Sequence, residues 1–376
     1  MAAPGGDRHF EFSQGCKDSD LRNDMKRAAR ILFSVTVAVM AHSLCALCVA
    51  QPAPQSNSLS PGDVAQVITA IKNPSANETI LSQAVAVGGN LLREKRYPEA
   101  AALFSALAVR LPNNGDVIYA QTLAVFNSGR AREAEPIAER AVSLTRTALI
   151  ANNAESVQRA ADSLVLLGVV LAVNGHDDRS LKALQEAARI APRHFDAQFS
   201  LGRQLFGMGD NGGAVKAFQT AKTLQPNNAQ VLFFLATALE RSGEIQPALA
   251  SYRELTALNP EAYEGHLGLG ALLLKRSELD EARRELERAL EINPNLYEAQ
   301  VALGRALIIG GRSGDAIPHL QKAAELAPNN PEPHYQLSLA YRRLGRKQDA
   351  ADEAAIVKRI HESRRGAKGA TSLPAS

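Results

Sequence analysis

The stretch YEGHLGLGALLLKRSELDEARRELERALEINPNL, residues 263–296, contains two helix patterns joined by a short turn. Leu269 and Leu273 lie on one face of the first helix, because residues four apart meet on the same side. The segment SELDEA begins the second helix, and Ser277 is its expected N-cap. Pro294 ends that helix, because proline cannot continue the hydrogen-bond ladder and restricts the residue before it. One unit is therefore a helix, a tight turn, a helix and a stop.

Small residues indicate how the two helices of a unit pack. Gly270 and Ala282 stand where the helices would cross most closely, and a larger side chain would push the axes beyond their spacing of roughly 8–10 Å. A glycine inside a helix costs about 1 kcal/mol relative to alanine. The recurrence of glycine at this place implies that the close approach of the two helices offsets this cost. The equivalent glycines are Gly88, Gly168, Gly202 and Gly304.

These residues resemble the tetratricopeptide repeat (TPR) family, whose 34-residue unit has a Leu-Gly pair in its first helix, an alanine and an aromatic residue in its second, and a terminal proline. The second-helix alanines are Ala100, Ala134, Ala214, Ala248, Ala282, Ala316 and Ala350. The terminal prolines are Pro112, Pro192, Pro226, Pro260, Pro294 and Pro328. The family's first-helix tryptophan is missing, and Leu164, Leu232, His266 and His334 stand in its place. The resemblance implies an all-α fold, an α-solenoid of helix–turn–helix units in a right-handed superhelix.

The array is expected to contain about eight units between residues 81 and 364. They are 81–114, 115–148, 161–194, 195–228, 229–262, 263–296, 297–330 and 331–364. The six units from Ala161 onward keep the 34-residue register, whereas 115–148 lacks both the Leu-Gly pair and the terminal proline. Residues 149–160 are an insertion, which we interpret as a lengthening of the two flanking helices with a break at Asn152-Asn153.

Both ends of such an array need a cover, because each unit exposes apolar surface that its own helices cannot bury. Residues 51–62 are rich in proline, serine and glutamine and are expected to form a linker. Residues 63–80 are expected to contain an N-terminal helix that seals the first unit, with Asp63 as its N-cap. Charged residues in 350–366 would cap the last unit, and 365–376 would be a disordered tail.

Residues 1–50 resemble a leader with a secretory signal peptide, whose true start could be Met25. A basic cluster, Lys26 to Arg30, precedes an apolar run and small residues around Ala50. The alternative is an uncleaved membrane anchor formed by residues 31–50, which contain no charged residue. We therefore expect export to the periplasm or beyond the cell, with membrane anchoring as the alternative. All three cysteines precede the expected cut after Ala50, so the mature chain would contain no disulfide.

No segment of the expected mature chain carries the sequence signature of a catalytic site. The formal charge of +3 gives no signal for nucleic-acid binding, and the hydrophobic fraction of 45% is that of an ordinary folded protein. The histidines are scattered over different units, and no phosphate-binding loop, dinucleotide fingerprint or nucleophile elbow is present. We therefore expect no catalytic residue, no metal, no cofactor and no enzymatic activity.

The resemblance implies a scaffold that binds a protein or peptide in the concave groove lined by first helices. Groove-facing residues recur at i, i+3, i+7 and i+10, and two interpretations are open. The aromatic residues could be exposed anchors with arginines binding carboxylates, or they could be buried between neighbouring units. The predicted partner-binding residues are Tyr119, Phe126, Phe199, Arg203, Phe206, Phe233, Arg241, Lys275, Arg305, Tyr335 and Arg342. The alternative function is an accessory subunit of a secretion, envelope-assembly or glycosyltransferase-type complex whose catalytic part is another chain.

Overall fold

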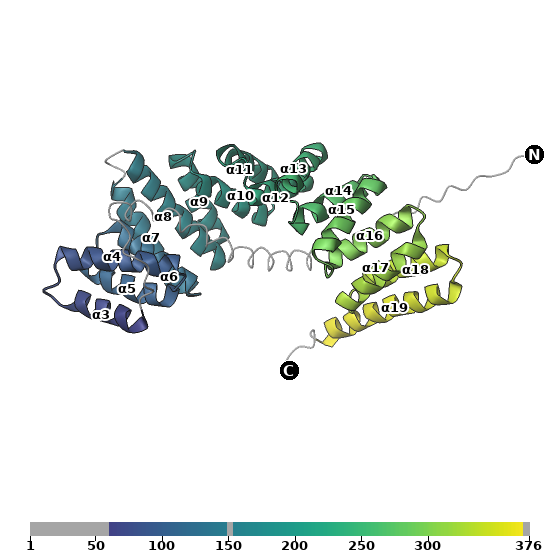
Figure 1. The fold of residues 1–376 in the computed structure, drawn as a ribbon, viewed down its shortest axis with the longest axis horizontal. Coiled ribbons are helices and arrows are strands. Elements are labelled where there is room, and N and C mark those ends of the chain that lie inside the picture. The colour runs from purple at the N-terminus through teal and green to yellow at the C-terminus, as the bar shows by residue number, and fades with distance from the viewer. Residues whose placement is uncertain (1–59, 149–152, 371–376) are drawn as a thin grey trace, which may run out of the picture. The chain divides into compact units, whose positions relative to one another are not determined.

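The computed structural model describes residues 60–148 and 153–370, which form helices and no strand (Figure 1). The predicted leader, its cysteines and nearly all of the predicted linker lie outside the described residues, as do residues 371–376. Among the described helices, Ala154–Val173 is long and apolar enough to span a membrane by length and composition, and 67% of its apolar window is buried inside the protein. Packing against neighbouring helices accounts for that apolar character.

The chain divides into two compact units, unit 1 up to Met208 and unit 2 from Gly209, which are described separately. Unit 1 contains α3 (Pro61–Lys72), α4 (Glu78–Arg93), α5 (Tyr97–Arg110), α6 (Gly115–Asn127), α7 (Ala131–Ala148), α8 (Ala154–Val173), α9 (Asp177–Ile190) and α10 (Phe195–Met208). Unit 2 contains α11 (Asn211–Leu224), α12 (Ala229–Ser242), α13 (Ile245–Leu258), α14 (Tyr263–Lys275), α15 (Leu279–Ile292), α16 (Tyr297–Ile309), α17 (Ser313–Leu326), α18 (Pro331–Arg343) and α19 (Lys347–Ala370).

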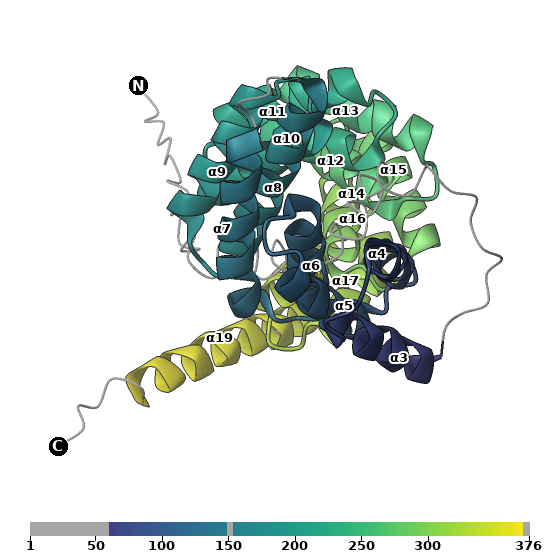
Figure 2. The ribbon, with the colours of Figure 1, turned by 90° about the vertical axis from the view of Figure 1, so that its left-hand side faces the viewer.

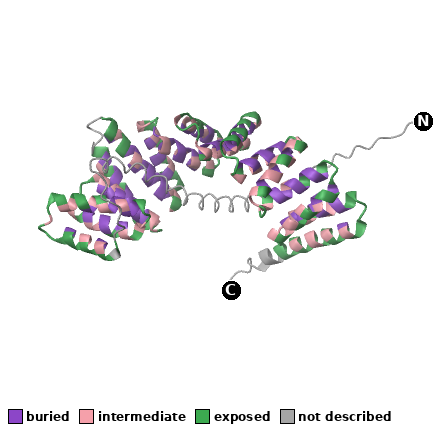
Figure 3. Ribbon diagram, in the orientation of Figure 1, coloured by how far each residue is buried: buried purple, intermediate pink, exposed green. Residues whose placement is uncertain are grey.

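Within each of the two units, consecutive helices pack against each other, as a solenoid of helix–turn–helix repeats requires. We call α4, α6, α8, α10, α12, α14, α16 and α18 the first helices, and the helix after each of them a second helix. In unit 2, α14 packs against its own second helix α15 and against the next first helix α16. Buried residues follow these contacts between consecutive helices in each unit (Figure 3). The predicted all-α repeat fold is confirmed.

The small residues lie where the two helices of a repeat cross. A Cβ atom built on Gly270 would lie 2.7 Å from Leu286 Cγ and 3.2 Å from the carbonyl oxygen of Ala282. Gly88 and Gly304 meet the residue sixteen positions later in the same way, since their built Cβ atoms lie 2.6 Å from Phe104 and 2.5 Å from Leu320. A side chain at these crossings would displace the residue of the second helix that packs there.

Ser277 does not cap α15, contrary to the prediction. The N-cap is Glu278, whose side chain makes no capping bond, and Ser277 lies in the preceding turn with φ of +63°. The equivalent residues one repeat before and after, Gly243 and Gly311, also have positive φ. The turn between first and second helix needs a left-handed residue, which glycine supplies without steric cost. The serine is therefore a strained member of a glycine series and not a helix cap.

Replacing Ser277 by glycine is expected to stabilise unit 2 by about 0.5–1 kcal/mol. A left-handed non-glycine residue costs roughly 1–2 kcal/mol, and the greater freedom of glycine in the unfolded chain removes part of the gain. The reverse substitution, Gly311→Ser, should destabilise by a similar amount. Nothing lies within 4 Å of its built Cβ, so the only cost is that of holding a serine in the left-handed backbone conformation. Urea unfolding of both variants measures the difference, and a Ser277→Gly protein weaker than wild type would disprove it.

The N-terminal end of the array differs from the prediction in its cap. Helix α3 begins at Pro61 with Ser60 as its N-cap, and Asp63 is the third residue of the helix. Ser60 Oγ accepts from the Asp63 backbone nitrogen at 3.3 Å, and Asp63 Oδ2 accepts from the Ser60 nitrogen at 2.8 Å, which is a reciprocal capping box. Helix α3 packs against α5 and α4 at the start of unit 1 (Figure 2).

Two other segments show how the array is lengthened. Helices α7 and α8 contain 18 and 20 residues, and Asn153 caps α8 by accepting from the Ser156 nitrogen at 2.8 Å.

At the C-terminus α19 continues to Ala370, so the predicted disordered tail 365–376 is wrong for its first six residues. No proline interrupts the chain between Glu362 and Pro374, and the arginine, alanine and lysine residues of 363–370 favour a helix in spite of Gly366 and Gly369.

Candidate partner-binding face

Unit 1 contains five of the predicted partner-binding residues, and two of them are buried. Phe199 is only 6% exposed and Phe126 only 9%, so in the free chain both agree with the second interpretation, in which neighbouring side chains bury them. Tyr119, Arg203 and Phe206 are half-buried. The periodicity places these residues on one side of their first helices. It could not indicate how deeply neighbouring side chains cover that side.

Phe199 belongs to a packed cluster on α10. Its ring stacks on that of Phe195, with centroids 5.7 Å apart and planes inclined by 12°. The guanidinium carbon of Arg203 lies 5.9 Å from the Phe199 ring centroid, which is cation–π distance. Burial lowers the pKa of Arg203 to about 10. Both side chains therefore contribute to the packing of α10, and truncating Phe199 would disturb the fold before it tested binding.

Acidic groups gather near Tyr119 on the first helices of unit 1. Burial raises the pKa of Tyr119 above its usual range, and the charges of Asp162 on α8 and Asp196 on α10 raise it further. His194 Nε2 lies 2.8 Å from Asp162 Oδ1, while His194 Nδ1 accepts from the Ala197 backbone nitrogen at 3.2 Å. His194 thus links the start of α10 to α8.

Replacing Asp196 by asparagine is expected to stabilise unit 1 at pH 7 by about 1 kcal/mol or less. Burial raises the pKa of Asp196, His194 opposes this, and Asp162 adds to the increase. The folded chain therefore holds this proton more tightly than the unfolded chain, where the pKa is about 3.9. Hence the contribution of Asp196 to wild-type stability falls as pH rises above about 4. Asparagine has no proton to lose and lacks that decline.

Asp178→Asn is the matched control for Asp196→Asn. Asp178 is likewise the second residue of its helix, α9, but it is exposed. There the carboxylate is favoured by the helix N-terminus by about 0.3–1 kcal/mol, so its removal should destabilise slightly. Thermal unfolding of the three proteins between pH 4 and 7 separates the two cases. An Asp196→Asn protein less stable than wild type at pH 7 would show that the helix dipole outweighs burial at this site.

Unit 2 contains the other predicted residues, Phe233, Arg241, Lys275, Arg305, Tyr335 and Arg342. Tyr335 on α18 is 51% exposed, and Arg305 and Arg342 are exposed on α16 and α18. Phe233 is half-buried, with its ring edge-to-face against Phe234 and centroids 5.6 Å apart. Arg241 and Lys275 are also exposed, and Lys275 forms an ion pair with Glu240 of the preceding first helix. The described part of unit 2 therefore presents exposed predicted side chains on α12, α14, α16 and α18, and the exposed aromatic residue among them is Tyr335 on α18.

The place of the family's tryptophan holds polar residues that link consecutive repeats. His266 on α14 is buried, with Nδ1 2.7 Å from Glu285 Oε2 on α15 and Nε2 3.1 Å from the carbonyl oxygen of Pro260 in the preceding repeat. Gln300, one repeat later, donates to the carbonyl oxygen of Pro294 at 3.0 Å. These contacts give His266 a packing role between two repeats. The shared 34-residue spacing of polar residue and proline was the signal that could have found them.

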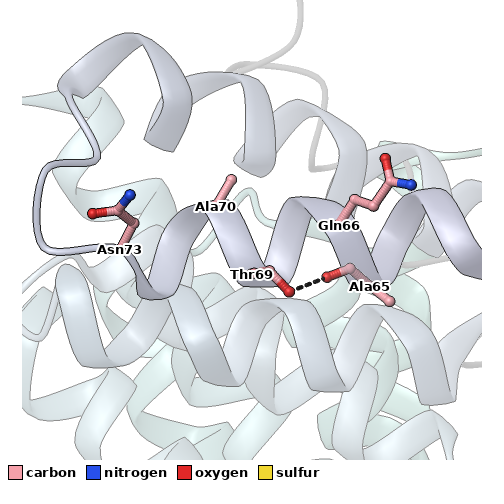
Figure 4. Close-up of a pocket in the computed structure, with 5 residues that line it drawn as sticks. All are labelled: Ala65, Gln66, Thr69, Ala70 and Asn73. Atoms are coloured by element: carbon pink, nitrogen blue, oxygen red, sulfur yellow. Dashed lines mark hydrogen bonds between the residues drawn. The ribbon is translucent and has the colours of Figure 1, made fainter.

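A surface hollow of about 460 Å³ lies on α3 (Figure 4). It is lined by Ala65, Gln66, Thr69, Ala70 and Asn73. The hydroxyl of Thr69 donates to the Ala65 carbonyl oxygen at 2.9 Å, and no lining residue titrates in the physiological range. The hollow has no acid–base pair with which to do chemistry. Within residues 60–148 and 153–370, no group of three His, Cys, Asp or Glu side chains could hold a metal ion.

Comparison with known proteins gives one family and several solved structures. The family model described as "Tetratricopeptide repeat" matches residues 166–229, 199–246, 235–297, 269–331 and 301–362, which together make slightly over half of the chain. The C-terminal part of a TPR repeat-containing protein from Cytophaga hutchinsonii is 17% identical with a TM-score of 0.52, over 66% of this chain and 98% of that one. This similarity shows the fold.

Two further solved structures align over shorter stretches. MamA from Desulfovibrio magneticus RS-1 is 22% identical with a TM-score of 0.44, covering 45% of this chain and 96% of that one. YrrB, described as a TPR protein with an unusual peptide-binding site, is 19% identical with a TM-score of 0.44, covering 50% of this chain and 95% of that one. A search of curated proteins gives no match.

Proposed function

The chain belongs to the tetratricopeptide repeat family, and from this premise we propose that it is a non-catalytic scaffold that binds a partner peptide or helix on the face formed by its first helices. Repeats of this family suit protein–protein interaction. The observation that carries the proposal is the exposed side of α18, where Tyr335 is 51% exposed and Arg342 lies on the same face. Aromatic and arginine side chains are the residues that most often dominate binding energy at interfaces.

Affinity capture tests this proposal with matched variants. Immobilised wild-type protein is compared with Tyr335→Ala/Arg342→Ala and with Arg284→Ala, a control on the exposed side of second helix α15. Both changes should leave the melting temperature nearly unchanged, because the side chains are exposed. Captured proteins that bind wild type and control but are about tenfold depleted on the double variant support the proposal. Equal capture by all three proteins would rule out this face.

The same capture experiment distinguishes a general scaffold from an accessory subunit of an enzyme complex. An accessory subunit would retain one enzyme in stoichiometric amount, such as a glycosyltransferase or a component of a secretion machine. A general scaffold would retain a protein without catalytic activity. We propose a protein or peptide partner in both cases and no nucleic acid, because the formal charge of the chain is only +3.

We further propose that this binding takes place outside the cytoplasm. The proposal rests on the basic residues from Lys26 to Arg30, followed by residues 31–50 without a charged side chain. The processed protein should begin near Gln51 and give no adduct with a thiol reagent, because its cysteines precede that residue. N-terminal sequencing and mass spectrometry of the labelled protein check this. An intact chain carrying Cys45 and Cys48 in the membrane fraction would instead establish the anchor.

A further inference from the structure

We propose that the first-helix face of α14, α16 and α18 takes an amphipathic partner helix with a basic flank over Glu264, Glu298 and Glu332 and an acidic flank over Arg305 and Arg342. This inference rests on the proposed scaffold function and adds the partner's chemistry and its direction. The three carboxylates are called the acidic row below. Leu267, Val301 and Tyr335, each three residues after one of them, are called the apolar row. The two arginines are called the basic pair.

The acidic row crosses three consecutive first helices. Each carboxylate is the second residue of its helix. Burial raises the pKa of Tyr297 to about 12, and the charges of Glu332 and Glu298 add to this increase. The pKa of Tyr263 is also raised, first by burial and then by Glu264, with Glu298 contributing. The pKa of each tyrosine is thus raised by a carboxylate of its own helix and by one of the next first helix. Carboxylates and phenol rings therefore share one edge of unit 2.

The negative charge of this row is not matched inside the described part of the chain. None of its three members forms an ion pair with a described Lys, Arg or His, and Glu332 accepts a neutral hydrogen bond from Gln336 at 2.8 Å. At two of the three equivalent places in unit 1 a basic side chain lies beside the carboxylate, whereas Asp196 at the third place forms no ion pair with a described residue. Asp116 lies 3.5 Å from Arg159, and Asp162 lies 2.8 Å from His194. The helix N-terminus favours a carboxylate in all of these repeats, so the dipole does not explain the difference. Unit 2 leaves this charge accessible to a basic partner.

The face changes from acidic to basic along α16 and α18. After the acidic row comes the apolar row, in which Tyr335 is the most exposed member and Leu267 is half-buried. Arg305 and Arg342 follow, exposed and outside every ion pair between described residues. They stand seven and ten residues after the acidic member of their own helix, which is about 10–15 Å at 1.5 Å per residue. A helix with its side chains is about 10–12 Å wide. A single partner helix therefore spans the face from the acidic row to the basic pair.

The width selects a helix over an extended strand. Neighbouring strands stand only about 4.8 Å apart, so a single strand on the apolar row would leave at least one charged edge uncovered. Three first helices at roughly 8–10 Å spacing need a partner of about 13 residues or more. Opposite charges on the two edges also fix its direction. Reversing the helix would place its basic flank against Arg305 and Arg342, and like charges at an interface are strongly unfavourable.

Two designed peptides of about 18 residues test the inference with the full chain. Both have the same composition and the same apolar face. One has lysine along one flank and glutamate along the other, and its isomer has both charges alternating on each flank. Fluorescence anisotropy should give about tenfold tighter binding for the segregated peptide at low salt and a smaller difference at high salt. Equal affinity for both peptides would overturn the inference.

Variants of the chain localise the effect. Glu264→Gln/Glu298→Gln/Glu332→Gln should remove most of the preference for the segregated peptide. The control, Asp280→Asn/Glu291→Gln/Glu325→Gln, removes the same charge from exposed places on second helices and should retain it. Arg305→Glu/Arg342→Glu should instead prefer a peptide with lysine on both flanks, because both edges are then acidic. Loss of preference in the control to the same extent would overturn the inference.

The two proposals can fail separately. If capture of a natural partner depends on Tyr335 while the two peptides bind equally, the scaffold function stands and the charge polarity of the face is wrong. If capture does not depend on Tyr335 and neither peptide distinguishes the variants, both are wrong. Both proposals are supported if the wild-type chain prefers the segregated peptide and the acidic-row variant no longer captures the natural partner.

Discussion

Phe218→Ala is expected to destabilise unit 2 by about 3–5 kcal/mol, the usual cost of truncating a buried phenylalanine. Phe218 on α11 is 0% exposed, and its ring stacks on Phe234 of α12 with centroids 5.6 Å apart and planes inclined by 23°. Alanine would leave a cavity between the second helix of one repeat and the first helix of the next. The loss should therefore concentrate at this junction, because each repeat of a solenoid contacts only its neighbours.

Hydrogen exchange resolved along the chain measures this loss. Protection should fall most in α11 and α12 and least toward α18 and α19. Leu258→Ala on α13 is the control, because Leu258 is 40% exposed and its truncation should change stability by no more than about 0.5 kcal/mol. A uniform loss of protection over the whole described chain would contradict the nearest-neighbour coupling of a solenoid.

Gly270→Leu is expected to cost about 1–3 kcal/mol or more through overpacking. The first added carbon would already lie 2.7 Å from Leu286 Cγ and 3.2 Å from the Ala282 carbonyl oxygen. A side chain can rotate away, but the carbonyl belongs to the backbone of α15. The two helices of the repeat must therefore separate, and the neighbouring repeats should lose part of their protection from exchange.

A smaller pair of substitutions shows that the cause is the crossing itself. Gly270→Ala and Leu286→Ala should each destabilise alone, and the double variant should be more stable than the sum of the single losses predicts, because the added methyl group enters the space that Leu286 vacates. Gly314→Leu is the control at an exposed position of α17, where nothing lies within 4 Å of a built Cβ. It should be neutral or stabilising, since leucine forms helices better than glycine. Destabilisation equal to that of Gly270→Leu would refute the packing explanation.

The helix pairs could be predicted from the sequence because small residues, prolines and apolar faces recur in one register. Local turn chemistry was harder to predict. Serine is both a common N-cap and one of the residues found in turns, so the pattern before α15 favoured the wrong role for Ser277. At α3 an aspartate took part in the cap, but as the third helical residue of a capping box whose N-cap is Ser60. Both errors concern one residue at a helix boundary and leave the repeat register unchanged.

The candidate site was harder to predict, because exposure depends on which helix lies alongside. Tyr335 and Val301 occupy equivalent places on α18 and α16. Val301 is 8% exposed, and α18 packs beside α16, whereas Tyr335 is on the last first helix of the described chain. Phe199 is buried because Phe195, one turn earlier on the same helix, stacks on it. A single sequence shows the side of a helix on which a residue lies and not the size of its neighbours in space.

The polar contacts at the first-helix position where the family has a tryptophan would allow one of these repeats to replace another. His266 pairs with Glu285 and Gln300 with His319, so each side-chain-specific contact joins two residues of one repeat. The contact that crosses a repeat boundary is to a proline carbonyl oxygen, which belongs to the backbone and is supplied by any repeat with that ending. A gene segment that encodes residues 263–296 could therefore be duplicated without orphaning a buried polar group, and the array could grow or shrink one cassette at a time.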